Sequence, residues 1–274
     1  MDVITSVQNP KVKSLLTLRE KSRDRRGKGL FTVEGRRETV RCAEAGFIPE
    51  EVYLCREIIL PGEASGVLDA VTAANPQCRC YEVSPAVYAK AAYREGTEGV
   101  IAVFRQKNLE LKDLQLSASP LLVVLESVEK PGNLGAVLRS ADAAGADAVI
   151  VCDPLTDLYN PNLIRSSTGG IFTVPTVACT SARAIAWLKE KGIGILTAQL
   201  QDSVPYYHTP MTGPVAIVFG TEATGLSETW RQAADAHIMI PMLGRLDSLN
   251  VSVSASILLF EAVRQRQLWK NGLE

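Results

Sequence analysis

The stretch Leu121–Cys152 reads LLVVLESVEKPGNLGAVLRSADAAGADAVIVC and contains one complete strand–turn–helix–strand unit. The apolar run Leu121–Leu125 has the length of a buried strand, and Pro131-Gly132-Asn133 is a turn sequence that opens a helix over Leu134–Ala144. A second apolar run, Ala148–Cys152, follows directly. Because a helix separates two buried strands, the stretch predicts a parallel sheet.

The same alternation continues to the end of the chain. Further strands are predicted over Phe172–Val177, Ile193–Thr197, Val215–Phe219 and His237–Ile240. Further helices are predicted over Asn160–Ser167, Ser181–Lys191 and Glu228–Ala234. Asn250–Trp269 is expected to form a long terminal helix, because Val253, Ile257 and Phe260 recur at helical spacing. Arg264 and Arg266 near its end suit the helix dipole.

The preceding part of the chain is less regular. Helices are expected over Arg36–Ala45 and Gly66–Ala74, and strands over Glu51–Leu54 and Val100–Phe104. Residues 105–119 (RQKNLELKDLQLSAS) are polar, which is typical of a linker. A chain of 274 residues exceeds the usual domain size. We therefore expect a small α/β domain over 1–104, a linker over 105–119 and a parallel α/β domain over 120–274; one large core is the alternative.

The composition is that of a globular protein, with 46% hydrophobic and 22% charged residues. The sequence has no run of about 20 apolar residues and no signal-peptide layout at its N-terminus, so we expect a cytoplasmic protein without membrane contact. Six cysteines are scattered, and the close pair Cys78 and Cys80 lacks the further ligands of a zinc site. Reduced, structural thiols and no metal are expected.

Charge is distributed unevenly although the formal net charge is only −1. Within Lys11–Lys28 the acidic residues are Glu20 and Asp24, and the basic residues are Lys11, Lys13, Arg19, Lys21, Arg23, Arg25, Arg26 and Lys28. Such a run is compatible with a solvated helix face. It is equally compatible with a phosphate-binding arm, because clustered cations release counterions from a nucleic-acid backbone.

Polar residues collect after three of the predicted strands, where ligands bind in open parallel sheets. After the first strand, Asn133 and Arg139 could line a site, or could simply cap a helix and face solvent. The second loop, Val218–Ser227, contains glycines that allow close backbone approach, a weak signal alone. The third loop leads into the terminal helix, and four small polar residues lie at the start of that helix: Ser248, Asn250, Ser252 and Ser254. Capping the helix N-terminus requires only one of them.

Together these loops resemble the three motifs of the SpoU (TrmH) family of RNA 2'-O-methyltransferases. The resemblance spans about Leu121–Arg266 and rests on NLGAVLRSADAAG, VFGTEATGL and IPMLGRLDSLNVSVSASILLFEAVRQR. Ala223 departs from it, since many members have glycine there, and its methyl group would narrow the pocket. NPKVKSLLTL and FTVEGRRETV in residues 1–104 resemble, less closely, the N-terminal substrate-binding domain of some members, which is similar to small ribosomal RNA-binding proteins.

The resemblance implies an α/β catalytic domain with a C-terminal trefoil knot, whose loops hold S-adenosylmethionine. Elementary topology would have argued against a knot. Residues that the resemblance places at the cofactor are Gly220, Leu226, Ile240, Met242, Leu249 and Asn250. The resemblance also implies a homodimer in which a second subunit completes the active site.

Arg139 is carried over from the family as the residue that activates the 2'-hydroxyl. Residues carried over as shaping the site are Asn133, Glu222, Ser248 and Asn250. Arginine is normally a permanent cation, so our hypothesis is that Arg139 holds the adjacent phosphate and stabilises the developing alkoxide. Arg165 is either a phosphate contact or part of a helix end. RNA contacts are expected from Lys11, Lys13, Arg23, Arg25, Arg26, Lys28, Arg36 and Arg165.

Two other classes of protein are weighed against this interpretation. A nucleotide-binding oxidoreductase would need a GxGxxG turn after its first strands, and Gly132-Asn133-Leu134-Gly135 is too short a match. An RNA-binding protein without catalysis is disfavoured because the family's site residues are all present. The sequence does not identify the RNA substrate. Large-subunit ribosomal RNA is preferred because the N-terminal domain resembles those of rRNA-modifying members of the family, and transfer RNA is the alternative.

Overall fold

The computed structural model describes residues 1–93 and 98–270 and forms two compact units. The N-terminal unit comprises Met1–Lys107 together with Asp157–Thr173. The C-terminal unit comprises Asn108–Thr156 and Val174–Glu274. A segment from the second half of the sequence, Asp157–Thr173, therefore folds with the first half. The sequence pattern places it in the 120–274 domain instead, because its helix follows a predicted strand like the others.

The N-terminal unit is built on a five-stranded mixed sheet in the order β1-β4-β3-β5-β2. Its strands are β1 Asp2–Ile4, β2 Leu30–Glu34, β3 Pro49–Leu54, β4 Arg79–Val83 and β5 Val100–Arg105. β1 and β3 run parallel to β4, whereas β2 and β3 run antiparallel to β5. The two strands predicted in this region, β3 and β5, are confirmed at the centre of the sheet.

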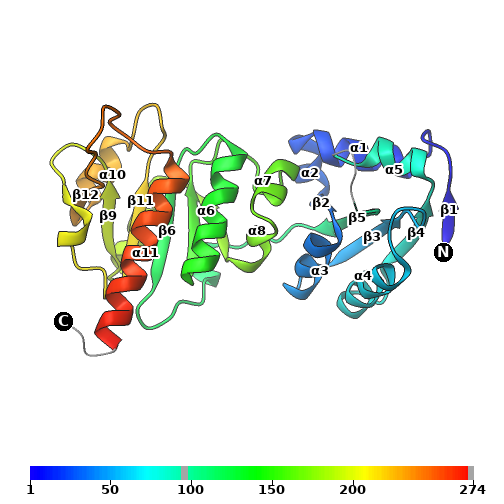
Figure 1. The fold of residues 1–274 in the computed structure, drawn as a ribbon, viewed down its shortest axis with the longest axis horizontal. Helices are drawn as coiled ribbons and strands as arrows, with labels where there is room; N and C mark the ends of the chain where they lie inside the picture. Colours follow the sequence, from blue (N-terminus) through cyan, green and yellow to red (C-terminus); the bar gives the residue numbers. More distant parts are fainter. Residues whose placement is uncertain (94–97, 271–274) are drawn as a thin grey trace. The chain divides into compact units, whose positions relative to one another are not determined.

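Helices cover both faces of this sheet. They are α1 Pro10–Glu20, α2 Ser22–Lys28, α3 Arg36–Glu44, α4 Pro61–Ala74, α5 Pro85–Ala91, α7 Pro161–Ser166 and α8 Gly170–Thr173. Figure 1 shows α1, α2 and α5 on one face and α3 and α4 on the other. α4 begins earlier than predicted because Pro61 occupies its first turn, where the missing N–H costs nothing.

An aromatic cluster fixes Asp157–Thr173 to the N-terminal unit. The Tyr159 ring stacks on Phe31 with centroids 4.4 Å apart, and Phe172 meets the edge of Phe47 at 5.3 Å. Phe172 lies in α8, so the predicted strand Phe172–Val177 is wrong at its start, and β8 covers only Thr176–Cys179. The apolar residues of α8 are buried by packing between elements distant in sequence, which periodicity within a short window does not detect.

The C-terminal unit contains a seven-stranded, fully parallel sheet in the order β10-β12-β9-β11-β6-β7-β8. Its strands are β6 Leu121–Glu126, β7 Ala148–Cys152, β8 Thr176–Cys179, β9 Gly194–Ala198, β10 Val204–Pro205, β11 Val215–Phe219 and β12 Ala236–Met239. β6, β7 and β11 are buried along their whole length. The α/β class with a parallel C-terminal sheet is confirmed, and the trefoil knot stays a prediction.

The helices of this unit are α6 Pro131–Ala144, α9 Ser181–Glu190, α10 Glu228–Ala233 and α11 Val251–Lys270. α6 and α11 lie side by side in Figure 1. The Ser140 hydroxyl on α6 and the Ser256 hydroxyl on α11 are 2.6 Å apart. Leu111 and Leu114, within the predicted linker 105–119, are buried in this unit's core, so that segment is not a solvated spacer. Within residues 1–93 and 98–270, no helix is both long and apolar enough to cross a membrane.

Candidate active site

The three motif loops meet at the carboxylate of Glu222. Asn133 on α6 donates from Nδ2 to Glu222 Oε1 at 3.0 Å, and Asn250 before α11 donates to the same oxygen at 2.6 Å. Asn250 Nδ2 also lies 3.2 Å from Asn133 Oδ1. Residues more than 100 positions apart thus form one polar cluster, as expected where strands of a parallel sheet end at a common edge.

The local structure explains why these side chains point together. Asn133 does not cap α6, since that position belongs to Lys130, so its amide is free to reach Glu222. Asn250 does cap α11, because its Oδ1 accepts from the backbone N–H of Ser252 at 3.0 Å while its Nδ2 donates to Glu222. The capping interpretation is therefore wrong for Asn133 but right for Asn250, which has both roles.

Lys130 completes this cluster, and the sequence interpretation missed it. Its Nζ lies 3.1 Å from Glu222 Oε2, and the Lys130 hydrogen bond is the largest cause that lowers the pKa of Glu222. Asn133 and the backbone N–H of Val251 lower this pKa further. Glu222 is therefore an anion held by residues at the starts of two helices, α6 and α11. The available signal was the position of Lys130 immediately before the Pro131-Gly132-Asn133 turn.

A cavity of about 350 Å³ lies beside this cluster, within the C-terminal unit. Its volume is within the range of pockets that take small molecules and cofactors. Predicted site residues that line it are Gly220, Glu222, Leu226, Ile240, Met242, Ser248 and Leu249. The structure thus brings together the predicted cofactor contacts, except that Asn250 is not among the lining residues.

Gly220 is required by the close packing of the cavity wall. A Cβ atom built on it would lie 2.2 Å from the backbone carbonyl of Gly225 and 2.5 Å from the backbone nitrogen of Leu226. Gly225 in turn has φ +69°, and its backbone pairs with that of Thr221 in both directions. The second loop is therefore a tight closed turn, and a side chain at Gly220 would open it.

Glu126, at the end of β6, supports the same loop from inside and was not predicted. Its side chain is buried, and Oε2 accepts from the backbone N–H of Ser227 at 2.8 Å. Ser227 directly precedes α10, so the carboxylate also lies at the positive end of that helix. Glu126 thereby connects the strand that leads into the first motif with the end of the second.

Arg139 lies outside the cavity. It is exposed on α6, it is not among the lining residues, and no hydrogen bond or ion pair is found for its side chain within the described residues. Its position on α6, six residues after Asn133, puts it on a different side of that helix. Within one chain, therefore, Arg139 and the cavity do not form a common site.

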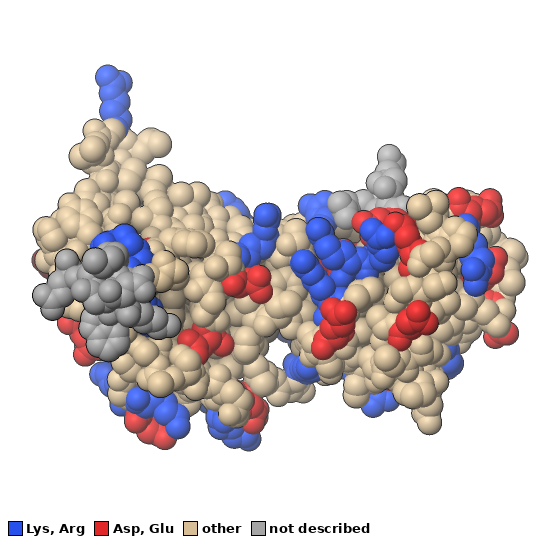
Figure 2. All heavy atoms as spheres, turned by 60° about the horizontal axis from the view of Figure 1, so that its bottom comes forward, with Lys and Arg blue, Asp and Glu red and all other residues tan. Residues whose placement is uncertain are grey.

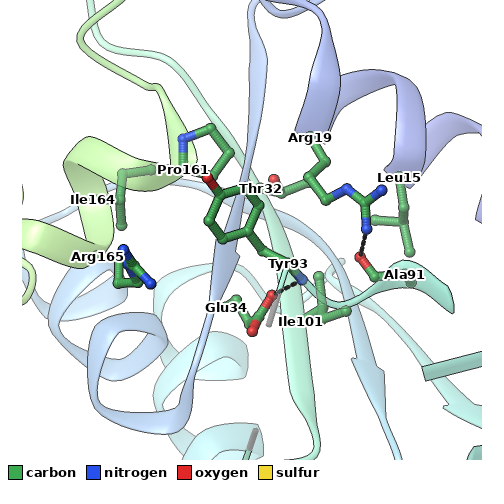
Figure 3. Close-up of a pocket in the computed structure, with 10 residues that line it drawn as sticks. All are labelled: Leu15, Arg19, Thr32, Glu34, Ala91, Tyr93, Ile101, Pro161, Ile164 and Arg165. Carbon is green, nitrogen blue, oxygen red and sulfur yellow. Dashed lines mark hydrogen bonds between the residues drawn. The ribbon is translucent and has the colours of Figure 1, made fainter. Parts of the chain in front are cut away.

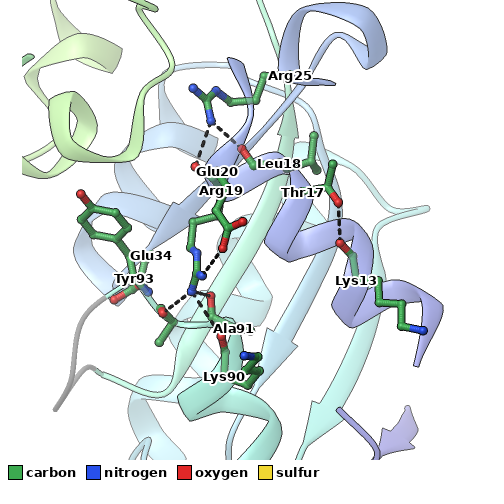
Figure 4. Close-up of polar contacts among 11 residues, drawn as sticks. Lys13, Thr17, Leu18, Arg19, Glu20, Arg25, Glu34, Lys90, Ala91 and Tyr93 are labelled. Carbon is green, nitrogen blue, oxygen red and sulfur yellow. Dashed lines mark hydrogen bonds and ion pairs between the residues drawn. The ribbon is translucent and has the colours of Figure 1, made fainter. Parts of the chain in front are cut away.

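The predicted RNA contacts fall into three groups. The prediction is wrong for Arg25, which is buried with 2% of its side chain exposed and pairs through Nε with Asp157 at 2.6 Å. Its Nη1 donates to the carbonyls of Leu18 and Arg19 (Figure 4). Lys11 and Arg36 are engaged in ion pairs with Glu51 and Glu63. The exposed members are Lys13, Arg23, Arg26, Lys28 and Arg165. Figure 2 shows basic side chains gathered on part of the N-terminal unit, with acidic ones beside them.

A second, much smaller cavity lies in the N-terminal unit between Arg19, Tyr93 and Arg165 (Figure 3). The Arg165 guanidinium is 5.9 Å from the Tyr93 ring centre, and Arg19 Nη1 donates to the Ala92 carbonyl at 2.7 Å. The cavity measures about 30 Å³. This is room for one or two waters, so the cofactor does not bind here.

Comparisons with known proteins identify the family of each part of the chain. The SpoU rRNA Methylase family matches residues 120–260, and the MRM3-like substrate binding domain matches residues 9–102. Over 183 residues the chain is 40% identical to the 23S rRNA (guanosine-2'-O-)-methyltransferase RlmB of Photobacterium profundum, which is 66% of this chain and 75% of that protein.

Two solved structures are similar over nearly the whole chain. An RNA 2'-O ribose methyltransferase is 39% identical with a TM-score of 0.84, covering 97% of this chain and 100% of its own. An AdoMet-bound rRNA methyltransferase from Sinorhizobium meliloti is 28% identical with a TM-score of 0.88, covering 96% and 97%. S-adenosylmethionine is the cofactor, and the size and glycine-lined wall of the cavity fit it. With its three motif loops joined at Glu222 beside that cavity, the chain belongs to the SpoU rRNA methylase family and is an RNA ribose 2'-O-methyltransferase.

Proposed function

We propose that this enzyme methylates a ribose 2'-hydroxyl in 23S ribosomal RNA. The observation that carries the proposal is the polar cluster of Asn133, Glu222 and Asn250 at a cofactor-sized cavity. The choice of RNA is supported by relatives named for 23S rRNA and by the MRM3-like substrate binding domain over residues 9–102. A ribosomal substrate also favours a cytoplasmic location.

The residues of the cluster have roles that follow from their contacts. S-adenosylmethionine supplies the electrophilic methyl group, so the protein must align a hydroxyl with it and help to remove a proton. In the proposal, Asn133 and Asn250 keep Glu222 oriented, and Glu222 fixes the third loop against the second. Ser248, exposed on the third loop and lining the cavity, is placed to contact the substrate ribose.

Arg139 is proposed to act in the cavity of a second subunit. Because it lies outside the cavity of its own chain, it can contribute to the reaction only if a dimer brings it to the partner's cavity. Exposed apolar side chains in the C-terminal unit support such an interface: Leu243, Leu246, Val253 and Phe260. In this arrangement Arg139 binds the phosphate beside the target ribose and stabilises the developing alkoxide.

Mixing two inactive variants tests the shared site. Arg139→Ala removes the arginine, and Gly220→Val closes the cavity, so each homodimer should be inactive. Random reassociation should restore about a quarter of wild-type activity, because half of the dimers are mixed and each has one complete site. A mixture as inactive as its components, with mixed dimers shown by co-purification through a different affinity tag on each variant, would place Arg139 and the cavity in the same subunit or remove Arg139 from the reaction.

The RNA target is tested by mapping ribose methylation across total RNA with and without the gene. The expected result is the loss of one 2'-O-methyl group in 23S rRNA and its return with the wild-type enzyme. Loss of a tRNA methyl group instead would replace rRNA by the alternative substrate. An unchanged map, together with normal binding of S-adenosylmethionine, would contradict the assigned RNA without affecting the cofactor site.

A further inference from the structure

Three polar residues that line the cofactor cavity remain outside every motif contact described above. Gln199 and Gln201 follow β9, and Arg231 lies on α10. Arg231 Nη2 donates to Gln201 Oε1 at 2.8 Å, and Gln199 Nε2 donates to the backbone carbonyl of Gln201 at 2.8 Å. The three residues form one hydrogen-bonded group on the cavity wall.

Two atoms of this group are buried without a partner. They are Nε of Arg231, a donor, and Oε1 of Gln199, an acceptor, and neither has a hydrogen bond within the described residues. Buried polar groups in proteins are nearly always satisfied, and an unsatisfied one is costly. Both atoms belong to residues that line the same cavity, which makes a molecule bound there their candidate partner.

Charge narrows the chemistry of that molecule. The acidic and basic residues on the cavity wall are Glu222, Arg231 and Asp247. Glu222 is already paired with Lys130, whereas Arg231 has no ion pair within residues 1–93 and 98–270. A cationic donor and a neutral acceptor, both hydrogen-bonded to Gln201 through their other atoms, are complementary to a group that carries a carboxylate and an ammonium together.

We infer that Arg231 and Gln199 bind the amino-acid group of S-adenosylmethionine. Arg231 Nε donates to its carboxylate, and Gln199 Oε1 accepts from its ammonium. A ribose diol could satisfy the same two atoms, but it would leave the charge of Arg231 uncompensated. The apolar lining residues, such as Leu226 and Ile240, are then left for the adenine ring.

Two ligands, one with this group and one without it, test the inference; they also differ in the sulfonium charge, so each variant is compared with the wild type for the same ligand. Calorimetry without RNA compares S-adenosylmethionine with 5'-methylthioadenosine, which keeps the adenosine and sulfur but lacks the amino-acid group. Arg231→Gln should weaken S-adenosylmethionine binding roughly tenfold to a hundredfold, the effect of removing a charged hydrogen bond, and leave 5'-methylthioadenosine binding within about twofold. Equal weakening of both ligands, or of neither, would overturn the inference.

Further variants separate binding from folding. Gln199→Leu removes the acceptor and should weaken S-adenosylmethionine selectively even if Arg231→Gln proves unstable. Arg183→Gln is the matched control, because Arg183 is exposed on the neighbouring α9 and does not line the cavity, so both ligands should bind it as they bind the wild type. Thermal unfolding without ligand checks that each variant is folded. Since no RNA is present, these results are independent of the proposed rRNA target.

Discussion

The carboxylate of Glu222 accepts hydrogen bonds from two other motif loops, so its charge is coupled to the geometry of the site. Lys130 balances that charge, and with 37% of the Glu222 side chain exposed the pair is partly screened by water. Single atoms therefore determine the geometry of the site. The Asn250 amide holds the third motif loop against Glu222, and the absence of a Cβ at Gly220 permits the tight turn of the second loop.

We predict that S-adenosylmethionine affinity depends on the ionisation of Glu222. Its pKa is lowered from 4.5 in the folded protein, chiefly by Lys130, so the carboxylate contacts are complete above pH 4.5 and disappear as pH falls through the lowered pKa. Calorimetry from pH 8 downward should show constant affinity and then a decline below 4.5. Glu222→Gln should bind more weakly already at pH 7, whereas Glu228→Gln, an exposed carboxylate on α10, should match the wild type. A decline that persists unchanged in Glu222→Gln would assign it to another group.

Gly220→Ala is expected to abolish tight cofactor binding. The added methyl group would lie 2.2 Å from the carbonyl of Gly225, so the turn must open, at a cost of about 1–3 kcal/mol in unfolding free energy. Denaturant unfolding and calorimetry measure the two effects. Gly213→Ala is the control, because no atom lies within 4 Å of its Cβ and its φ is not positive. Wild-type affinity in Gly220→Ala would contradict the role given to this close approach.

Among the elements, the loop between β7 and β8 departs most from a simple α/β pattern. It carries α7 and α8, and its Asp157–Thr173 segment is part of the N-terminal unit through Tyr159, Phe172 and Asp157. The ion pair of Asp157 with Arg25 is desolvated on both sides, with 10% and 2% of the side chains exposed. Buried charges of this kind are tolerated only when both partners are present.

Arg25→Met should therefore destabilise the protein by about 3–5 kcal/mol, because Asp157 Oδ2 and two backbone carbonyls lose the Arg25 donor while the side-chain volume is largely kept. Urea unfolding monitored by fluorescence gives the change. The neighbouring exposed Arg26 provides the comparison, and Arg26→Met should stay within about 0.5 kcal/mol of the wild type. Similar destabilisation in both variants would mean that helix α2, and not the buried pair, determines the stability.

The terminal helix α11 also has a role that its sequence pattern did not indicate. Arg266 is interpreted from the sequence as a favourable charge near the helix end. In the structure its guanidinium donates to the backbone carbonyls of Ser119, Pro120, Met211 and Gly213. These hydrogen bonds connect the helix to the residues before β6 and to the loop before β11. Five donors in a rigid fork make arginine suited to this task.

For the whole molecule, we predict that RNA affinity and cofactor affinity are separable. Exposed basic residues of α1 and α2, Lys13, Arg23, Arg26 and Lys28, lie in the N-terminal unit, whereas the cofactor cavity lies in the C-terminal unit. Replacing one of them with alanine should weaken RNA binding and reduce the slope of log affinity against log salt by about 0.7–0.9 for each phosphate that the variant no longer neutralises. Filter binding across a salt series measures this.

S-adenosylmethionine affinity should be unchanged in the same variants, as calorimetry would show. Lys189→Ala, an exposed lysine on α9, is the control for a general charge effect. If it changes the salt slope as much as Lys13→Ala does, the basic residues of α1 and α2 are not the preferred RNA contact. A solvated helix face would then be the correct interpretation of the run Lys11–Lys28.

Much of the architecture could be predicted because buried strands and helix ends produce recognisable patterns within a few consecutive residues. The runs that form β6, β7 and β11 are apolar enough to be recognised as buried strands, and the helices after them carry their own stop signals, such as Gly145. β1 and β4 were not predicted. β1 has only three residues, and β4 combines charged and apolar residues, so neither gives a clear period.

The amino-acid sequence by itself determined the parallel α/β class, the three motif loops and, through their resemblance to a family, the reaction and its cofactor. Only the tertiary structure decided that Glu222 joins the loops with Lys130, that Arg25 is buried while Arg26 is exposed, and that Arg231 lines the cavity. The physical reason is that strand and helix periods are local properties of a chain. Burial, ion pairing and unsatisfied donors depend on partners far away in sequence, and folding alone brings them together.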